Sequence, residues 1–328
     1  MSSIDLVYTW VNPDGEDLAR ERHRLSKLLT GEDHEYRAGD ARSRDNGEIR
    51  HSISSALRYL PFLRRIYIVG AGGRPSWLPV DSDTLRFVDQ ADLLPDKVQI
   101  TFSSDVVEAH IHKVPGLSDR YIYANDDYFF SALHTERDFF TDDGRCVITV
   151  SPRFAGLGVT GTYQHMEINS VRALGRCAKP QKVVWPQGTG LKRRLGEQYR
   201  AARLGIPLVN TPSHVALPYL RSEWAGFSRT FAPEIKQIEA SPFRSDKGFA
   251  TNFTYVHYLA GRGRAVMALD PRHAYLDRRE NAETRRAFAE AVQRGEYSRF
   301  CLNDGPAPDG DGWVEFIETL FGEERETA

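Results

Sequence analysis

The sequence lacks the features of a secreted or membrane-spanning protein. Its three cysteines, Cys146, Cys177 and Cys301, are an odd number at no metal-ligand spacing, whereas a secreted disulfide framework normally has an even number. The first ten residues hold no basic region followed by an apolar stretch, and no apolar run approaches the roughly 18 residues of a membrane span. We therefore expect reduced thiols and a cytoplasmic location, with peripheral membrane association left open.

The chain also lacks a charge imbalance and the short motifs of several enzyme classes. Its formal net charge is -2, which gives no sign of a nucleic-acid partner. There is no phosphate loop, no dinucleotide glycine fingerprint after a strand, no zinc-protease helix and no serine elbow. These absences argue against a nucleoside triphosphatase, a dehydrogenase, a metalloprotease and an esterase. The 328 residues are 41% hydrophobic, which suits one large globular domain or two small ones.

Strands and helices alternate in the first half of the sequence. Apolar runs and helical spacing predict strands over 4–10, 66–69, 85–88 and 120–124, and helices over 16–29, about 46–60 and 104–113. We expect Ile49, Ile53, Leu57 and Leu60 to share one face of the second helix, which Asp45 or Asn46 can cap. This order predicts an α/β fold with a mostly parallel sheet, helices on both faces and ligands at the carboxyl ends of the strands.

The second half is less regular. Frequent glycine and proline between 151 and 218 predict a smaller insertion or subdomain rather than a continuation of the sheet. Helical periodicity returns over 250–259, 282–293 and 313–321.

Two predicted strands end in polar residues at the expected ligand edge. Trp10 to Asp14 follows the first strand, and Asn125-Asp126-Asp127 follows the strand at 120–124. Adjacent carboxylates repel each other unless a hard cation such as magnesium neutralises them, and such a cation can bridge the phosphates of a nucleotide. A solvated acidic turn is the alternative, because Asn-Asp pairs are common in turns.

Other candidates lie in polar loops. The segment 44–50 begins a helix, where free N–H groups favour an anion, although Asp45 could equally be a helix cap. His214 can accept a proton near neutral pH, and Arg244 can pair with a phosphate in a two-pronged geometry. Neither residue identifies a function alone. Gly188 to Arg194 is either a phosphate clamp or, as is more common, a solvated basic turn.

The same segments, in order, resemble the four conserved regions of the Stealth proteins. These proteins include bacterial capsular polysaccharide phosphotransferases and the catalytic subunit of the lysosomal-enzyme GlcNAc-1-phosphotransferase. The first region is similar to Ile4–Asn12, and the third is similar around His214 and Arg244. The second resembles Arg44–Ile53, Ile66–Val69, Pro75–Leu78 and Pro115–Asp127, and the fourth resembles Cys301–Asp304. Together the four regions span nearly the whole chain.

The resemblance implies a GT-A-like nucleotide-sugar transferase core within a single catalytic domain over 1–328. On this reading, 1–150 binds the nucleotide-sugar, 151–245 is an insertion or acceptor region, 246–322 completes the core and 323–328 is a tail. The resemblance places Asp5, Asp45, His214 and Arg244 at catalytic positions. Trp10, Asn12, Asn46 and Arg50 are then expected to bind the nucleotide, and Asp126, Asp127 and Asp304 to hold Mg²⁺ or Mn²⁺.

The expected reaction moves hexose-1-phosphate, with GlcNAc-1-phosphate as the expected group, from a UDP-sugar to a carbohydrate or polysaccharide hydroxyl. It forms a phosphodiester and releases UMP. His214 or Asp45 would take the proton, and histidine is favoured because a carboxylate that caps a helix is a weak base. The alternatives are a GT-A-type glycosyltransferase that releases UDP and a non-catalytic carbohydrate-binding homologue. The sequence does not determine the oligomeric state.

Overall fold

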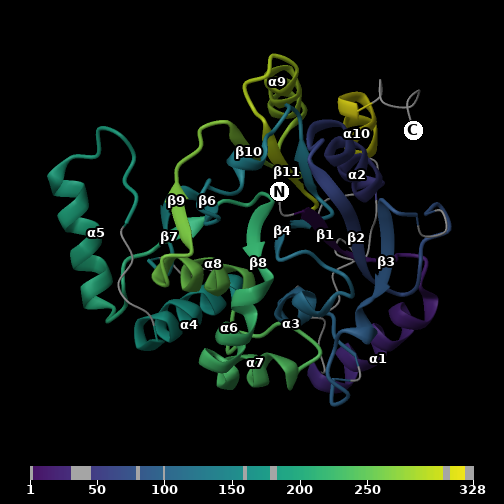
Figure 1. Ribbon diagram of the computed structural model, residues 1–328, viewed down its shortest axis with the longest axis horizontal. Helices are drawn as coiled ribbons and strands as arrows, with labels where there is room; N and C mark the ends of the chain where they lie inside the picture. The colour runs from purple at the N-terminus through teal and green to yellow at the C-terminus, as the bar shows by residue number, and fades with distance from the viewer. Residues whose placement is uncertain are drawn as a thin grey trace.

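A five-stranded sheet forms the centre of the molecule (Figure 1). The computed structural model describes residues 3–30, 46–78, 82–98, 100–157, 161–177, 183–305 and 311–321. The sheet has the order β3-β2-β1-β4-β8, formed by β1 (Ile4–Val11), β2 (Leu63–Ala71), β3 (Leu85–Asp89), β4 (Arg120–Asn125) and β8 (Leu217–Leu220). The pairs among β1 to β4 are parallel, and β8 is antiparallel to β4. The predicted α/β fold with a mostly parallel sheet is confirmed.

The helices are α1 (Glu16–Thr30), α2 (Glu48–Tyr59), α3 (Ser104–His110), α4 (Thr162–Cys177), α5 (Leu191–Arg203), α6 (Trp224–Thr230), α7 (Ala232–Glu239), α8 (Thr251–Gly261), α9 (Ala282–Gln293) and α10 (Trp313–Phe321). The predicted helices correspond to α1 to α3 and α8 to α10, whereas α4 to α7 were not predicted from the sequence. Beyond His110, the predicted third helix continues only as a 3-10 turn, Ile111–Lys113. No helix among the described residues combines the length and the apolar character needed to cross a membrane.

Two details of α2 differ from the prediction. Leu57 is 51% exposed, whereas Ala56 is fully buried between Ile53 and Leu60. The buried apolar positions of α2 are spaced three and four residues apart, as 3.6 residues per turn requires, and Leu57 lies outside this buried side of the helix. The N-cap is Gly47, with a φ of 88° and no side-chain cap bond, so the prediction that Asn46 caps the helix is wrong.

The helices α2 and α3 cover opposite faces of the sheet. Ser52 of α2 donates a hydrogen bond to the Tyr8 hydroxyl at 2.9 Å, and the Tyr123 hydroxyl donates to Glu108 of α3 at 3.1 Å. Tyr123 also lies 3.0 Å from the hydroxyl of Thr9, the residue after Tyr8. Because successive strand residues point to opposite faces, the two helices lie on different sides of the sheet, as predicted.

The second half adds two small sheets and one strand of the large sheet. One small sheet has the order β10 (His273–Asp277), β11 (Arg299–Asn303), β5 (Tyr128–Phe130). The other has the order β7 (Asn210–Pro212), β6 (Cys146–Phe154), β9 (Ala265–Ala268). The strand β8 extends the large sheet, and its first two residues lie within 151–218, where the sequence predicted an insertion or subdomain rather than a continuation of the sheet. Pro218 fits there because β8 lies at the edge of the sheet, where a missing N–H is tolerated.

Candidate functional site

The turn Asn125-Asp126-Asp127 connects the large sheet to a small one. Asn125 is the last residue of β4, and the turn leads into β5, which pairs with β11. The backbone N–H of Leu302 donates to the carbonyl oxygen of Asp127 at 3.0 Å. This pairing brings the predicted acidic turn next to Cys301 and to Asp304, which are about 175 residues away in the sequence.

Asp127 has an incompletely satisfied carboxylate. Its Oδ2 atom accepts a hydrogen bond from the Cys301 thiol at 3.2 Å. Its Oδ1 atom is buried and has no hydrogen-bond partner among the described residues. Burial raises the pKa of Asp127, the bond from Cys301 opposes the rise, and the charges of Glu48 and Asp304 add to it. A buried carboxylate oxygen without a donor is costly unless a ligand satisfies it.

A divalent cation fits this carboxylate. Ligand atoms of Asp127, His214 and Cys301 lie within 4.8 Å of one another. Burial and the neighbouring Asp127 raise the pKa of the Cys301 thiol well above its ordinary value, and the thiol donates its hydrogen bond to Asp127. Carboxylate oxygens suit hard cations such as Mg²⁺ or Mn²⁺, whereas an imidazole or a thiol suits softer ones. Asp126, the neighbouring residue of the turn, is not in this group of ligand atoms, but its charge adds to the rise in the pKa of Cys301.

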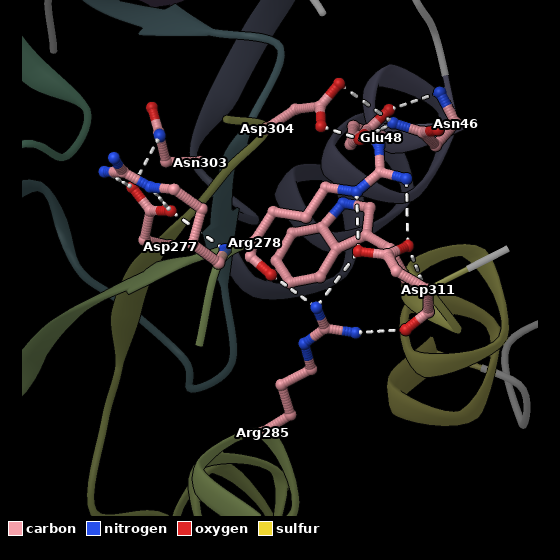
Figure 2. Close-up of polar contacts among 10 residues, drawn as sticks. Asn46, Glu48, Asp277, Arg278, Arg285, Asn303, Asp304 and Asp311 are labelled. Carbon is pink, nitrogen blue, oxygen red and sulfur yellow. Dashed lines mark hydrogen bonds and ion pairs between the residues drawn. The ribbon is translucent and has the colours of Figure 1, made fainter. Parts of the chain in front are cut away.

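The structure gives Asp304, the third expected metal ligand, a counter-ion from the protein. Arg278 donates to Asp304 at 2.8 Å and to Asp311 at 2.9 and 3.0 Å (Figure 2). Arg285 donates to Asp311 as well. Hydrogen bonds from Arg278 lower the pKa of Asp311 to about 2. Asp304 therefore belongs to an arginine network, and it acts on Asp127 through its charge.

Asn46 lies in the same area and links α2 to Asp304. Its backbone and side-chain nitrogens donate to the Glu48 carboxylate at 2.6 and 2.7 Å, and its side chain reaches Asp304 at 3.4 Å (Figure 2). These bonds place the start of α2 beside the acidic turn. Asp45, the alternative helix cap and base, lies outside the described residues.

His214 lies between the acidic turn and Arg244. Its ring packs edge-on against Tyr128 at 5.1 Å and Tyr275 at 5.6 Å, and it lines a small pocket together with Tyr163. Part of His214 is open to solvent, but the protein atoms packed around it and the charge of Arg244 lower its pKa below the ordinary value of 6.5. His214 is therefore neutral at pH 7 and can accept a proton.

Arg244 is held by α3. Its Nε donates to Asp105 at 2.6 Å, its Nη2 donates to Ser104 at 2.5 Å, and its guanidinium lies 6.0 Å from the Tyr163 ring. Burial alone would lower the pKa of Arg244, but the carboxylates of Asp105 and Glu108 outweigh it and keep the group charged. Arg244 is thus a fixed positive charge close to His214, supported by residues that the sequence analysis did not select.

Aromatic and amide side chains meet at the carboxyl ends of β1 and β2. Trp10 and Trp77 pack edge to face at 6.1 Å, and the Arg50 guanidinium lies over the Trp77 ring at 5.0 Å. Asn12 donates to the carbonyl oxygens of Gly72 and Gly73, both at 3.3 Å. The Trp10 indole N–H is buried without an acceptor among the described residues. The structure therefore brings Trp10, Asn12 and Arg50 together, as expected from the sequence.

Asp5 is not brought to this edge. It lies at the amino end of β1, it is fully buried, and its carboxylate accepts bonds from Arg64 at 2.6 and 2.9 Å and from the Ser118 N–H at 2.7 Å. These contacts give Asp5 a role in tying β1 to the start of β2 and to the loop that contains Ser118.

Sequence reasoning missed Asp105, Glu108 and Arg278. The first two were detectable, because they are spaced three residues apart among apolar residues in α3 and both are buried. A buried pair of carboxylates in a short helix predicts a buried positive partner. No comparable sequence signal marks Arg278, whose partners Asp304 and Asp311 lie 26 and 33 residues further along the chain.

Comparison with known proteins gives a family assignment. The profile of Stealth protein conserved region 2 matches residues 42–148. Capsular polysaccharide phosphotransferase LcbA of Aeromonas hydrophila is 34% identical over 309 residues, which are 92% of this chain and 78% of LcbA. Exopolysaccharide phosphotransferase CpsY of Mycobacterium tuberculosis is 29% identical over 329 residues, which are 97% of this chain and 56% of CpsY. The chain thus spans about half the length of CpsY.

Among solved structures, the galactosyltransferase LgtC is 12% identical and matches 97% of this chain and 95% of its own, with a TM-score of 0.40. The fold assignment rests on the strand order and directions, not on this similarity. The profile match and the identity to LcbA over most of both chains show that this chain belongs to the Stealth family.

Proposed function

We propose that this protein transfers hexose-1-phosphate from a nucleoside diphosphate sugar to a carbohydrate hydroxyl. The observation that carries the proposal is the unsatisfied buried oxygen of Asp127, next to a neutral His214 that lies beside the fixed charge of Arg244. Relatives named as capsular and exopolysaccharide phosphotransferases support the same reaction. We expect UDP-GlcNAc as the donor and a polysaccharide as the acceptor.

Asp127 and Asp126 are the residues that would hold a magnesium or manganese ion. Such an ion neutralises the negative charge of a sugar nucleotide diphosphate when it is bound. The arginine network around Asp304 holds the neighbouring loop in place, because each of its carboxylates already has a positive partner.

His214 is the proposed general base. A hydroxyl oxygen of the acceptor forms a bond to the phosphorus nearer the sugar, and the bond from that phosphorus to the nucleoside monophosphate breaks. The hydroxyl proton passes to the unprotonated nitrogen of His214. The anomeric carbon does not react, so its configuration is retained. Asp45 is the alternative base.

Arg244 would stabilise the charge that develops on the transferred phosphoryl group. Its bonds to Asp105 and Ser104 fix the guanidinium before substrate arrives, which reduces the reorganisation needed during the reaction. Trp10, Asn12 and Arg50 would line the nucleotide position, with the unpaired Trp10 indole N–H as a donor. In this proposal the donor binds at the carboxyl edge of the sheet.

The test is to incubate the protein with magnesium and a panel of nucleotide-sugars, with an oligosaccharide acceptor, and to identify the released nucleotide by chromatography. We expect UMP and a phosphodiester signal in the phosphorus NMR spectrum of the product. Excess chelator and Asp127→Asn should each abolish turnover. Release of UDP with a phosphate-free glycoside would instead indicate a glycosyltransferase, and donor binding without any release would indicate a carbohydrate-binding homologue. A cytoplasmic location stays a prediction.

A further inference from the structure

Helix α5 stands away from the rest of the molecule and has an apolar stripe that no described residue covers (Figure 1). Leu191, Leu195 and Tyr199 are 70%, 56% and 64% exposed. They are spaced four residues apart, so they lie on one side of the helix. Leu204, just after the helix, is 51% exposed, so four of the ten large exposed hydrophobic side chains in the described part of the chain fall within 14 residues.

Contact between α5 and the body is slight. Ala201 is the buried residue of the helix. Arg200 donates to the carbonyl oxygen of Leu157 at 3.1 Å, and Arg194 donates to that of Thr189 at 3.1 Å. The stripe stays exposed although Arg200 and Ala201 of the same helix contact the body. Burying it against the protein is therefore not what keeps α5 helical.

The charge of α5 complements an anionic surface. The helix contains five basic residues, Lys192, Arg193, Arg194, Arg200 and Arg203, and one acidic residue, Glu197, which accepts a bond from Arg200. Lys192, Arg193 and Arg203 form no ion pair with the described residues. Arg203 follows Tyr199 by four residues, and its guanidinium lies 6.0 Å from the Tyr199 ring. Lys192 precedes Tyr199 by seven residues. Both basic residues therefore lie beside the apolar stripe.

We infer that α5 docks this protein on an anionic lipid surface, with the stripe in the acyl boundary and the basic residues at the headgroups. An apolar face with basic residues beside it is the pattern of a helix that lies in the membrane interface. A soluble polyanion would account for the basic residues but not for three exposed hydrophobic side chains in line. The docking is independent of the proposed reaction and needs no residue of the candidate site.

The test is flotation of the full chain with vesicles of phosphatidylcholine alone and with added phosphatidylglycerol. We expect binding to the anionic vesicles, weaker at high salt, and little binding to the neutral ones. Each basic residue near the surface contributes roughly a fivefold change in affinity, so Lys192→Glu with Arg193→Glu should weaken binding by well over tenfold. Leu195→Glu should weaken it by at least about tenfold, because it places a charge in the apolar stripe.

The matched controls are Leu133→Glu, at another exposed leucine, and Arg286→Glu with Lys236→Glu, on exposed positions of α9 and α7. Thermal unfolding confirms that each variant is folded. No binding to anionic vesicles, or equal losses in the controls, would overturn the inference. The inference would also be overturned if Lys192→Glu with Arg193→Glu lost binding but Leu195→Glu did not. That result would indicate a soluble polyanion as the partner. Sedimentation without lipid completes the test, since a dimer that Leu195→Glu dissociates would identify a second copy as the partner.

Discussion

Asp127 and Asp311 are both near Asp304, but their surroundings differ. Asp311 accepts bonds from Arg278 and Arg285, and its pKa is lowered to about 2. In the described part of the chain Asp127 has no arginine partner and its buried Oδ1 atom has no donor, and its pKa is raised. The comparison separates a carboxylate that the fold neutralises from one whose neutralisation is left to a ligand. Buried charges without protein partners are candidates for function.

The largest expected effect is in the group around Asp127. His214→Ala should reduce turnover by roughly a hundred- to ten-thousand-fold, the usual loss when a general base is removed, while thermal stability changes little. Single-turnover rates measure the chemical step, and donor-binding measurements show whether the variant still binds the donor. His165→Ala, an exposed histidine on α4, is the matched control and should keep full activity. Near-normal turnover of His214→Ala would leave Asp45 as the base.

The arginine network should show the opposite behaviour, with a loss of stability. Arg278→Met leaves Asp304 and Asp311 without their main positive partner, which should lower the free energy of unfolding by about 3 to 5 kcal/mol. Urea unfolding measures this change. The control Arg294→Met removes an exposed arginine paired with Glu290 and Glu296, and we expect a change within about 0.5 kcal/mol. Equal changes in the two variants would mean that the carboxylates paired with Arg278 contribute no more to stability than an exposed ion pair does.

We expect Arg244 to act on the substrate together with Asp127 and His214, although Asp105 and Ser104 already bind its guanidinium. Arg244→Lys keeps the charge but cannot bond Asp105 and Ser104 in the same planar geometry. Loss of one charge-assisted bond, worth about 1.5 to 3 kcal/mol, should reduce turnover roughly ten- to a hundred-fold. The control is Arg262→Lys, at an exposed pair with Glu223. If Arg244→Lys lost stability but kept its rate, Arg244 would be structural.

The smallest expected effect is a gain of stability in Asp127→Asn, measured with excess chelator. The folded-state pKa of Asp127 lies above its ordinary 3.8, so ionisation destabilises the folded state increasingly as the pH rises above that value. The variant should therefore be more stable than the native protein at pH 8. The difference should vanish below pH 4. Asp142→Asn, at an exposed carboxylate, should show no such pH dependence. A less stable Asp127→Asn at pH 8 would mean that the protein satisfies this carboxylate after all.

The sequence by itself determined the local helices and strands, and it showed which polar residues follow the first strands. The strands β1 to β4, the helices α8 to α10 and the acidic turn after β4 could be predicted, because apolar periodicity and turn residues act over a few positions. Parallel pairing then required Trp10, Asn12 and Asp127 to lie at one edge of the sheet.

Only the tertiary structure decided which polar residues are partnered. Asp5 and Asp304 were expected in the active site as Asp127 was, yet Arg64 neutralises the first and Arg278 the second. The placement of β8 at the sheet edge likewise depends on long-range pairing with β4. A carboxylate has the same local sequence signal whether an arginine from a distant loop reaches it or not. The difference arises from contacts between segments far apart in the chain, and it determines which charges stabilise the fold and which remain for a ligand.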